Sequence, residues 1–434
     1  MTVRVAPLSK KQIDRLPERA REVVEYRKSG LSLNHIQGCP LDCAYCIRHT
    51  YGLWDHRVPR ALMSDAEAVE ELVNHRYFQP HVTPVQVFNR ATDPFLPAVR
   101  PHTFAVLEDL DKRELTNHVL VITRHAMKPE DSDQLHQLRH VKVTLLFTFS
   151  GIDNPEIEPY PSHVAADSLK LMSAPSPRKY RTIFYWRPLV PGLNDSDEHL
   201  AQAHELAAHA DATVFTGLFY RDEIAEYYKA NGLPEPYEDT ARRKIVPETL
   251  EARVLAVFDL ATPLFRKTSC AVSYAHGLPD YNGHVGIREL CDICPLSQLE
   301  LCSGTHRVPS ADQLRQVAGE LPEARGLVVV DITERSAIVS GLETEQPRYY
   351  MQHAFGFQVH DVRHPHHECR HGRADIGWKE REQGVRLDEP ALRGRGRGGQ
   401  RPAAARSGGA GRRADHRRDH WGAGELAGQA GDAH

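Results

Sequence analysis

The chain lacks a long apolar run and a leader-like N-terminus. No segment approaches the roughly 18 consecutive apolar residues that a membrane-spanning helix needs. Residues 1–30 carry many charged side chains and contain no apolar stretch ahead of a small-residue cleavage site. We therefore expect a cytoplasmic protein that does not contact a membrane.

An excess of positive charge is also missing. The formal net charge is −4, and nine arginines against four acidic residues in 392–434 leave the rest of the chain at about −9. Aromatic and basic residues are rarely interleaved. A body of this kind argues against a sequence-independent electrostatic grip on nucleic acid, so nucleic acid is not the favoured partner.

Cysteine is scarce and unevenly placed. Seven of the eight cysteines fall into two groups, and only Cys369 lies outside them. The cytosol keeps thiols reduced, so such groups predict metal binding or catalysis rather than disulfides. The first group is Cys39, Cys43 and Cys46, and the second is Cys270, Cys291, Cys294 and Cys302.

Strand and helix patterns alternate regularly between residues 30 and 222. Six apolar runs predict strands at 31–36, 85–88, 119–123, 143–149, 182–186 and 213–218. Helical periodicity predicts five helices between them, at 65–75, 101–110, 129–140, 164–172 and 197–209. This α/β pattern predicts a parallel sheet, either open and doubly wound or curled as a barrel. In both folds the functional loops follow the carboxyl ends of the strands, where the first cysteine group lies.

Changes of composition divide the chain into five predicted parts. They are a helical extension (1–29), the sheet-forming part (30–222), a helix with the second cysteine group (223–308), a small α/β module (309–390) and a Gly/Arg/Ala-rich tail (391–434). The tail's composition predicts disorder. In the module, Ser310 and Gln313 predict a capping box, and 327–332, 337–340 and 348–360 predict strands.

The first cysteine group is suited to a metal with an open coordination position. Thiolates select iron–sulfur clusters, zinc or copper(I), and three thiolates without a fourth leave one position for a substrate or cofactor. The alternative is a zinc site completed by His49 or His35. The position of the cysteine loop, after the first strand of a βα series, favours an iron–sulfur cluster over zinc.

The motif Cys39-x3-Cys43-x2-Cys46, with Tyr45 before the last cysteine and six βα units around it, resembles the radical S-adenosylmethionine superfamily. Residues 89–95 and 186–195 are similar to its spore photoproduct lyase and photolyase-like branch. The resemblance implies a partial (β/α)6 TIM-like barrel and a catalytic [4Fe–4S] cluster on Cys39, Cys43 and Cys46. It also implies an enzyme that cleaves S-adenosylmethionine reductively to a 5′-deoxyadenosyl radical, with an electron donor such as ferredoxin or flavodoxin.

The same resemblance indicates cofactor contacts. Thr92 and Asp93 follow the second strand and are candidates for the methionine amino group, although the chain has no Gly-Gly-Glu. Ser150 is a candidate for the ribose, Arg187 for the carboxylate, and Tyr45 occupies the motif's aromatic position. The structural alternative for Thr92, Asp93 and Ser150 is turn or cap chemistry. Arg187 is the best candidate, because an arginine amid apolar strand residues needs an anionic partner.

The second cysteine group supplies four thiolates and therefore a closed site. A structural zinc and a second [4Fe–4S] cluster are both compatible with it. Six histidines and one cysteine lie close together in the sequence at the end of the small α/β module: His353, His360, His364, His366, His367, Cys369 and His371. The histidines indicate either a metal or proton-transfer site or a basic surface. Cys369 is a candidate hydrogen-atom donor.

Three functional hypotheses follow. The first is a radical S-adenosylmethionine enzyme that abstracts hydrogen from a small molecule. The second is radical repair or modification of a nucleic-acid base or nucleoside. The third is a non-catalytic zinc-binding interaction protein, which would be colourless.

Overall fold

The computed structural model describes residues 5–238, 240, 246–258 and 262–362, and the backbone of 370–371 and 374–375. These residues belong to one unit, residues 1–392. The predictions for the tail 391–434 and for Cys369, His364, His366 and His367 fall outside the described residues. No helix in the described part of the chain is long and apolar enough to cross a membrane.

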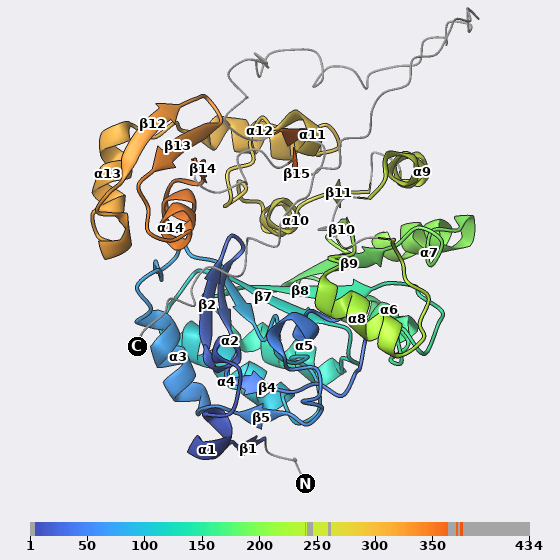
Figure 1. Cartoon of the computed structure of the whole chain (residues 1–434). Helices are drawn as coiled ribbons and strands as arrows, with labels where there is room; N and C mark the ends of the chain where they lie inside the picture. The colour runs from blue at the N-terminus through green and yellow to red at the C-terminus, as the bar shows by residue number, and fades with distance from the viewer. Residues whose placement is uncertain are drawn as a thin grey trace, which may run out of the picture. The chain divides into compact units, whose positions relative to one another are not determined.

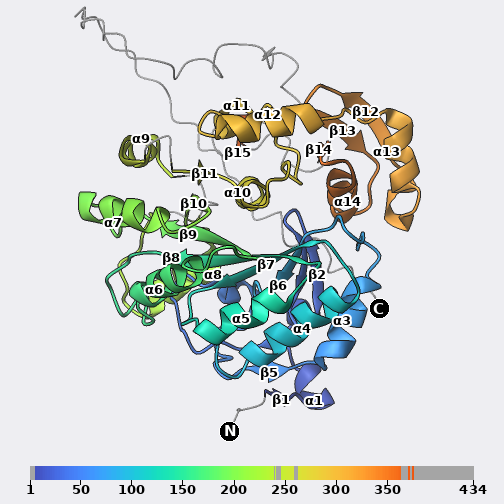
Figure 2. The same cartoon turned by 180° about the vertical axis from the view of Figure 1, so that it is seen from behind.

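An eight-stranded, mainly parallel sheet forms the centre of the unit (Figures 1 and 2). Its strand order is β11-β10-β9-β8-β7-β6-β3-β2, and only the β2–β3 pair is antiparallel. All six predicted strands are present. The strands are β2 (Val24–Arg27), β3 (Gly30–Leu33), β6 (Val85–Val87), β7 (His118–Thr123), β8 (Lys142–Phe149), β9 (Arg181–Leu189), β10 (Ala212–Gly217) and β11 (Leu264–Phe265).

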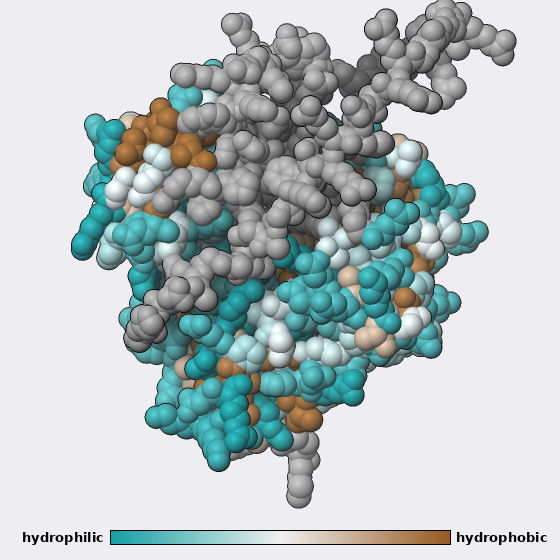
Figure 3. Space-filling model, in the orientation of Figure 1, coloured by the Kyte–Doolittle hydropathy of each residue, from teal (hydrophilic) through white to brown (hydrophobic). Residues whose placement is uncertain are grey.

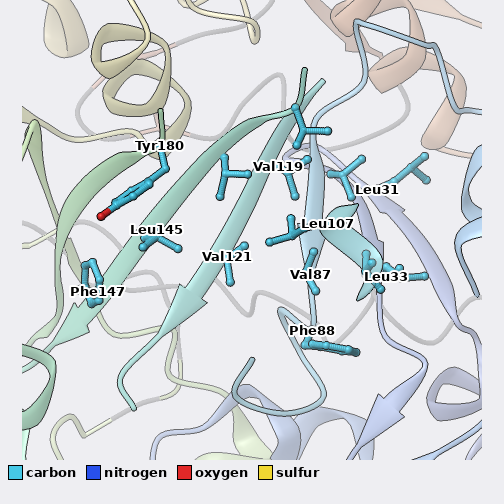
Figure 4. Packing of buried hydrophobic residues seen from close by; sticks show 14 of the residues in the cluster. Leu31, Leu33, Val87, Phe88, Leu107, Val119, Val121, Leu145, Phe147 and Tyr180 are labelled. Atoms are coloured by element: carbon cyan, nitrogen blue, oxygen red, sulfur yellow. The ribbon is translucent and has the colours of Figure 1, made fainter. Parts of the chain in front are cut away.

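The five predicted crossover helices pack on one face of this sheet. From β3 to β10 the parallel strands follow one another in chain order, so each right-handed crossover places its helix on the same side. Figure 4 shows Leu107 among Val87, Val119, Val121 and Leu145 of the strands. The sheet is therefore singly wound, which excludes the doubly wound alternative. The helices are α3 (Asp65–Val73), α4 (Arg100–Lys112), α5 (Pro129–Gln137), α6 (Ser162–Ser173) and α7 (Asp197–Ala207).

The opposite face of the sheet, here called the inner face, is shared by two features. A second apolar cluster there joins strand residues such as Leu120, Leu146 and Ile183 to Ala271 and Val272 of α10 (Thr268–Ala275). Side chains alternate along a strand, so the residues two positions further on point to the same side. Ile122 and Thr148 lie two positions beyond Leu120 and Leu146, and Arg187 lies four positions beyond Ile183. All three line a cavity at the carboxyl ends of the strands.

The N-terminal part differs from the predicted helical extension. Its described residues form the short helices α1 (Lys10–Ile13) and α2 (Glu18–Arg21), and Val24–Arg27 is a strand rather than a helix. Val24 and Tyr26 are buried and alternate with half-buried neighbours, which is the period of a strand. Pairing with β3 overrides the helical propensity of the charged residues around them.

The C-terminal module contains β12 (Val328–Ile332), β13 (Ser336–Ser340), β14 (Gln358–Asp361) and α13 (Ala311–Ala318), which starts with the predicted Ser310–Gln313 capping box. The prediction of a strand over 348–360 is wrong in its first half, because α14 occupies Gln346–Phe355. Pro347 lies in its first turn, and Gly356 ends it with φ +54°. Tyr349 and Tyr350 favoured a strand locally, but these terminal signals decide the element.

The remaining elements complete the described chain. Figure 3 shows an apolar patch over β12, where Val328 and Val330 are exposed. The other elements are β1 (Ala6–Pro7), β4 (Ile36–Gln37), β5 (Arg60–Ala61), the 3-10 helices Ile47–Tyr51 and Pro322–Ala324, α8 (Asp222–Ala230), α9 (Glu248–Val257), α11 (Arg288–Cys291), α12 (Leu296–Thr305), β15 (Arg370–His371) and β16 (Ala374–Asp375).

Candidate metal and cofactor site

The first cysteine loop is fixed by its own backbone. Gly38 has φ +107°, and a Cβ there would lie 2.4 Å from the carbonyl oxygen of Val58, so only glycine fits. The Cys39 amide donates to the carbonyl of His56 at 2.9 Å, and the Ala44 amide donates to the carbonyl of Ile157 at 2.9 Å. These bonds tie both ends of the loop to other segments. Hydrogen bonds to other parts of the chain therefore hold the backbone of the loop.

All three cysteines of the loop face one cavity. Cys39 and Cys43 are buried, Cys46 is half-buried, and none of them forms a disulfide. They line a cavity of about 200 Å³ at the carboxyl ends of the parallel strands. Burial raises the pKa of the Cys39 and Cys43 thiols to about 12. Thiolates are stable here only beside added positive charge, which a bound metal provides.

The donor set fits a cluster better than a single zinc. His35 Nε2 lies 2.8 Å from Asp65 Oδ1, and His49 stacks on Trp54 with the ring centroids 3.9 Å apart. In the described ranges, no three ligand atoms drawn from these cysteines and histidines lie within 4.8 Å of one another. Three ligands of one tetrahedral zinc would lie within roughly 4 Å. Each thiolate of an iron–sulfur cluster binds a different iron, which suits the wider spacing.

Arg187 brings positive charge to the cavity. It lies near the carboxyl end of β9, and its Nη1 donates to the Tyr185 hydroxyl at 3.0 Å. Its guanidinium also lies 4.3 Å from the centre of the Tyr185 ring. No carboxylate in the described chain forms an ion pair with it. Arg187 therefore stays a candidate for binding an anion in the cavity.

Thr92 and Asp93 line the cavity but also hold its wall together. The Thr92 hydroxyl donates to the carbonyl of Gly38, which joins the loop after β6 to the cysteine loop. Asp93 accepts hydrogen bonds from the Thr123 hydroxyl at 2.8 Å and the Arg124 amide at 2.9 Å. Both the cofactor and the turn interpretations of these residues are compatible with this geometry.

Tyr45 belongs to a buried charged network. Its hydroxyl donates to the Glu158 carboxylate and accepts a bond from Arg124 Nη1 at 2.9 Å. Arg124 and Glu158 form an ion pair at 3.1 Å. The Ser150 hydroxyl donates to Glu158 at 2.6 Å, and Ser150 is not among the described residues that line the cavity. Burial raises the pKa of Glu158, but Arg124 and the hydrogen-bonded hydroxyls lower it by more than burial raises it. The net shift of the pKa is therefore downward.

Sequence reasoning missed Arg124, Glu158 and Arg48. Arg124 follows β7 directly, so the rule that selected Arg187 at the end of β9 would also have found it. Arg48 lies in the turn after Cys46, and its Nη1 donates to the carbonyl of His56 at 3.0 Å. Glu158 lies in a loop and reaches the network only through tertiary packing, so no local pattern marks it.

About half of this chain is similar in structure to spore photoproduct lyase and to SuiB, at low sequence identity. A point mutant of spore photoproduct lyase matches 50% of this chain at 14% identity with a TM-score of 0.37, and 64% of its own chain is covered. Spore photoproduct lyase complexed with dinucleoside spore photoproduct matches 54% of this chain and 72% of its own, at 13% identity and a TM-score of 0.37.

Streptococcus suis SuiB bound to S-adenosylmethionine is a third similar structure. It matches 53% of this chain at 13% identity and a TM-score of 0.33, and 44% of its own chain is covered. No protein-family model matches the sequence, and no curated protein matches it.

The second cysteine group also comes together in space. Cys270 lies in α10, Cys291 ends α11, Cys294 lies in the following turn and Cys302 lies in α12. None of the four forms a disulfide. The pKa of the Cys270 thiol is raised well above its ordinary value, first by burial and then by Asp280 and the other three cysteines. Cys270 is therefore near enough to the other three cysteines to interact with them electrostatically, and the four-thiol site stays a prediction.

Proposed function

We propose that this chain is a radical S-adenosylmethionine enzyme whose [4Fe–4S] cluster is held by Cys39, Cys43 and Cys46. The observation that carries the proposal is a set of three free thiols on one cavity at the carboxyl ends of parallel strands. The fold proposed for this enzyme is a partial (β/α)6 barrel, and the singly wound sheet supports it. When bound, the cluster and S-adenosylmethionine would supply a 5′-deoxyadenosyl radical for hydrogen abstraction.

The chain's own residues bind and orient. Arg187, which has no acidic partner in the described chain, binds the methionine carboxylate by charge-assisted hydrogen bonds. Asp93 is the candidate for the methionine amino group, because its carboxylate lines the same cavity. Arg48 places positive charge beside Cys39 and Cys46. Burial lowers the pKa of its guanidinium, but the neighbouring cysteines raise it more, so the net shift is upward. The buried Tyr45–Arg124–Glu158 network holds the wall behind the loop rigid.

A small molecule is the proposed substrate class. The cavity of about 200 Å³ and the acidic body of the chain support it. A low-potential carrier such as ferredoxin or flavodoxin is the proposed electron donor. The second candidate, a nucleic-acid base or nucleoside, predicts binding to DNA or RNA that persists at moderate salt in a gel-shift assay, and such binding would reverse the preference.

The test is reductive cleavage of the cofactor. The wild-type protein is reconstituted anaerobically with iron and sulfide, reduced with dithionite and given S-adenosylmethionine, and 5′-deoxyadenosine is measured by chromatography. We expect product from the wild type and none from Cys43→Ala. The control is Gln202→Ala, at an exposed position of α7, which should leave the yield unchanged. Equal yields from Cys43→Ala and the wild type, or no yield from either, would sink the proposal.

A further inference from the structure

The second cysteine group lies on the inner face of the sheet, beneath the cavity. Cys270 packs with the apolar cluster that joins α10 to Leu120, Leu146 and Ile183 of the strands. Further along these strands, Ile122, Thr148 and Arg187 line the cavity of the first group. The two groups therefore face the same side of the same strands, one toward each end.

One sulfur of this group, Cys302 Sγ, has the surroundings of a metal-bound thiolate. The Gln298 side-chain amide donates to Cys302 Sγ at 3.3 Å in a buried position, and the same nitrogen donates to the carbonyl of Leu278 at 2.9 Å. N–H donors aimed at cysteine sulfur are a known means of stabilising metal-bound thiolates and of tuning cluster potential.

A buried acid–histidine pair adjoins Cys270. Asp280 Oδ2 accepts hydrogen bonds from the His284 backbone amide at 2.9 Å and from the His284 ring at 2.8 Å, and both side chains are almost fully buried. The latter contact is shorter than the roughly 3.3 Å that two nitrogen or oxygen ligands keep on one tetrahedral zinc. The contact is therefore a hydrogen bond, and His284 Nδ1 and Asp280 Oδ2 are not both ligands of one zinc. The pair supports the site by packing beside Cys270.

The spacing of the sulfurs selects the kind of metal centre. In the described ranges, ligand atoms of Cys270, Asp280 and His284 lie within 4.8 Å of one another. In that part of the chain, no three of the four cysteine sulfurs lie that close together. Sulfurs on a single zinc would lie roughly 3.8 Å apart. We propose that Cys270, Cys291, Cys294 and Cys302 hold a second iron–sulfur cluster rather than a structural zinc.

A hydrogen-bonded connection links this centre to the cavity. The Tyr185 hydroxyl accepts a bond from Arg187 Nη1 at 3.0 Å and lies 3.1 Å from the hydroxyl of Thr268. Thr268 is the first residue of α10, two positions before Cys270. The second cluster thus lies next to the floor of the cavity, and its electrostatic field acts on whatever Arg187 binds there.

The test measures metal content and does not use activity. The triple variant Cys39→Ala, Cys43→Ala, Cys46→Ala removes the first group, and Cys291→Ala with Cys294→Ala disrupts the second. Both are purified and reconstituted anaerobically beside the wild type and the Gln202→Ala control. Iron, acid-labile sulfide and zinc are then counted per chain, and the reduced samples are examined by electron paramagnetic resonance.

The outcomes separate this proposal from the proposed function. We expect the triple variant to keep about four irons and four sulfides without zinc, and the wild type to hold about twice as much iron. One zinc and no iron in the triple variant would show a structural knot and overturn the proposal, as would a metal-free triple variant. Because the triple variant leaves all four second-group cysteines intact, misfolding of the other variant does not affect the result. Failure of S-adenosylmethionine cleavage leaves this count unchanged.

Discussion

The first and second cysteine groups differ in what positions them. The first spans residues 39–46, and its backbone is hydrogen-bonded to His56 and Ile157, beside the large core of the sheet. The second spans residues 270–302 on α10, α11 and α12, which have eight, four and ten residues. Ile287 and Leu290 form a small separate cluster there, and Leu296 is 62% exposed.

This difference separates a preorganised site from one that depends on its metal. Backbone bonds and a buried sheet keep the first loop in shape before any cluster binds, so cofactor binding there costs little ordering. Helices as short as α11 are marginal alone, and around α11 the second region buries only the small cluster of Ile287 and Leu290, whereas α10 packs on the sheet. Where the ligands are not otherwise held together, metal-binding free energy becomes folding free energy.

Metal removal should therefore have its largest effect on the second region. We expect anaerobic removal of iron to reduce amide hydrogen-exchange protection across residues 268–305 by at least about tenfold, because the short helices lose their common anchor. The strands β7 to β9 should change little. The measurement is hydrogen-exchange mass spectrometry on loaded and metal-free protein.

The matched control for that experiment is the first-group triple variant. It removes the first cluster and leaves the second in place, so residues 268–305 should stay protected. Equal loss of protection around residues 39–46 and 268–305 in the metal-free wild type would show that the two sites depend on metal to the same degree.

Glu158→Gln should give the next largest effect, on the protein side of the first site. It leaves Arg124 buried without its carboxylate partner, and breaking such a pair costs about 3–5 kcal/mol of unfolding free energy. The control is Glu205→Gln, which removes an exposed partner of Lys170 and should cost at most about 1 kcal/mol. Urea unfolding followed by circular dichroism measures both.

The pH dependence of the same variant follows from the lowered pKa of Glu158. A carboxyl with a lowered folded pKa contributes stability above its ordinary pKa and loses it as the pH falls through the folded value. The difference between the wild type and Glu158→Gln should therefore be constant near neutral pH and shrink below about pH 4. A difference that persists unchanged well below that pH would show that the charge of Glu158 is not what matters.

The sequence predicts the first region better than the second because the first follows local rules. Strand periodicity and the carboxyl-end rule place Cys39–Cys46 and Arg187 without any knowledge of packing. The placement of α10 on the inner face follows no local rule, since it depends on which face the five crossover helices leave uncovered. Likewise β2 and the Arg124–Glu158 pair form through partners distant in sequence.

Arg187 offers a sharper test of the first site. Loss of its charge-assisted hydrogen bonds in Arg187→Ala should cost about 1.5–3 kcal/mol, or roughly ten- to a hundredfold in affinity for S-adenosylmethionine. The control is Arg181→Ala at the other end of the same strand, where Nε donates to the carbonyl of Ala275 at 2.7 Å. Equilibrium dialysis with the cluster-loaded protein measures the affinity. Equal losses in both variants would remove the special role of Arg187.

Tyr185→Phe should give the smallest effect and tests whether the two regions are coupled. The substitution removes the hydroxyl between Arg187 and Thr268, so it should cost about 1 kcal/mol, a roughly fivefold loss of S-adenosylmethionine affinity. Coupling between sites is reciprocal, so S-adenosylmethionine should in turn raise hydrogen-exchange protection of α10 in the wild type and less in Tyr185→Phe. A double-mutant cycle with Thr268→Val isolates the connection, because the effect of Tyr185→Phe should shrink once Thr268 has lost its hydroxyl. Additive effects would mean that Tyr185 supports Arg187 alone and that the two cysteine regions bind their ligands independently.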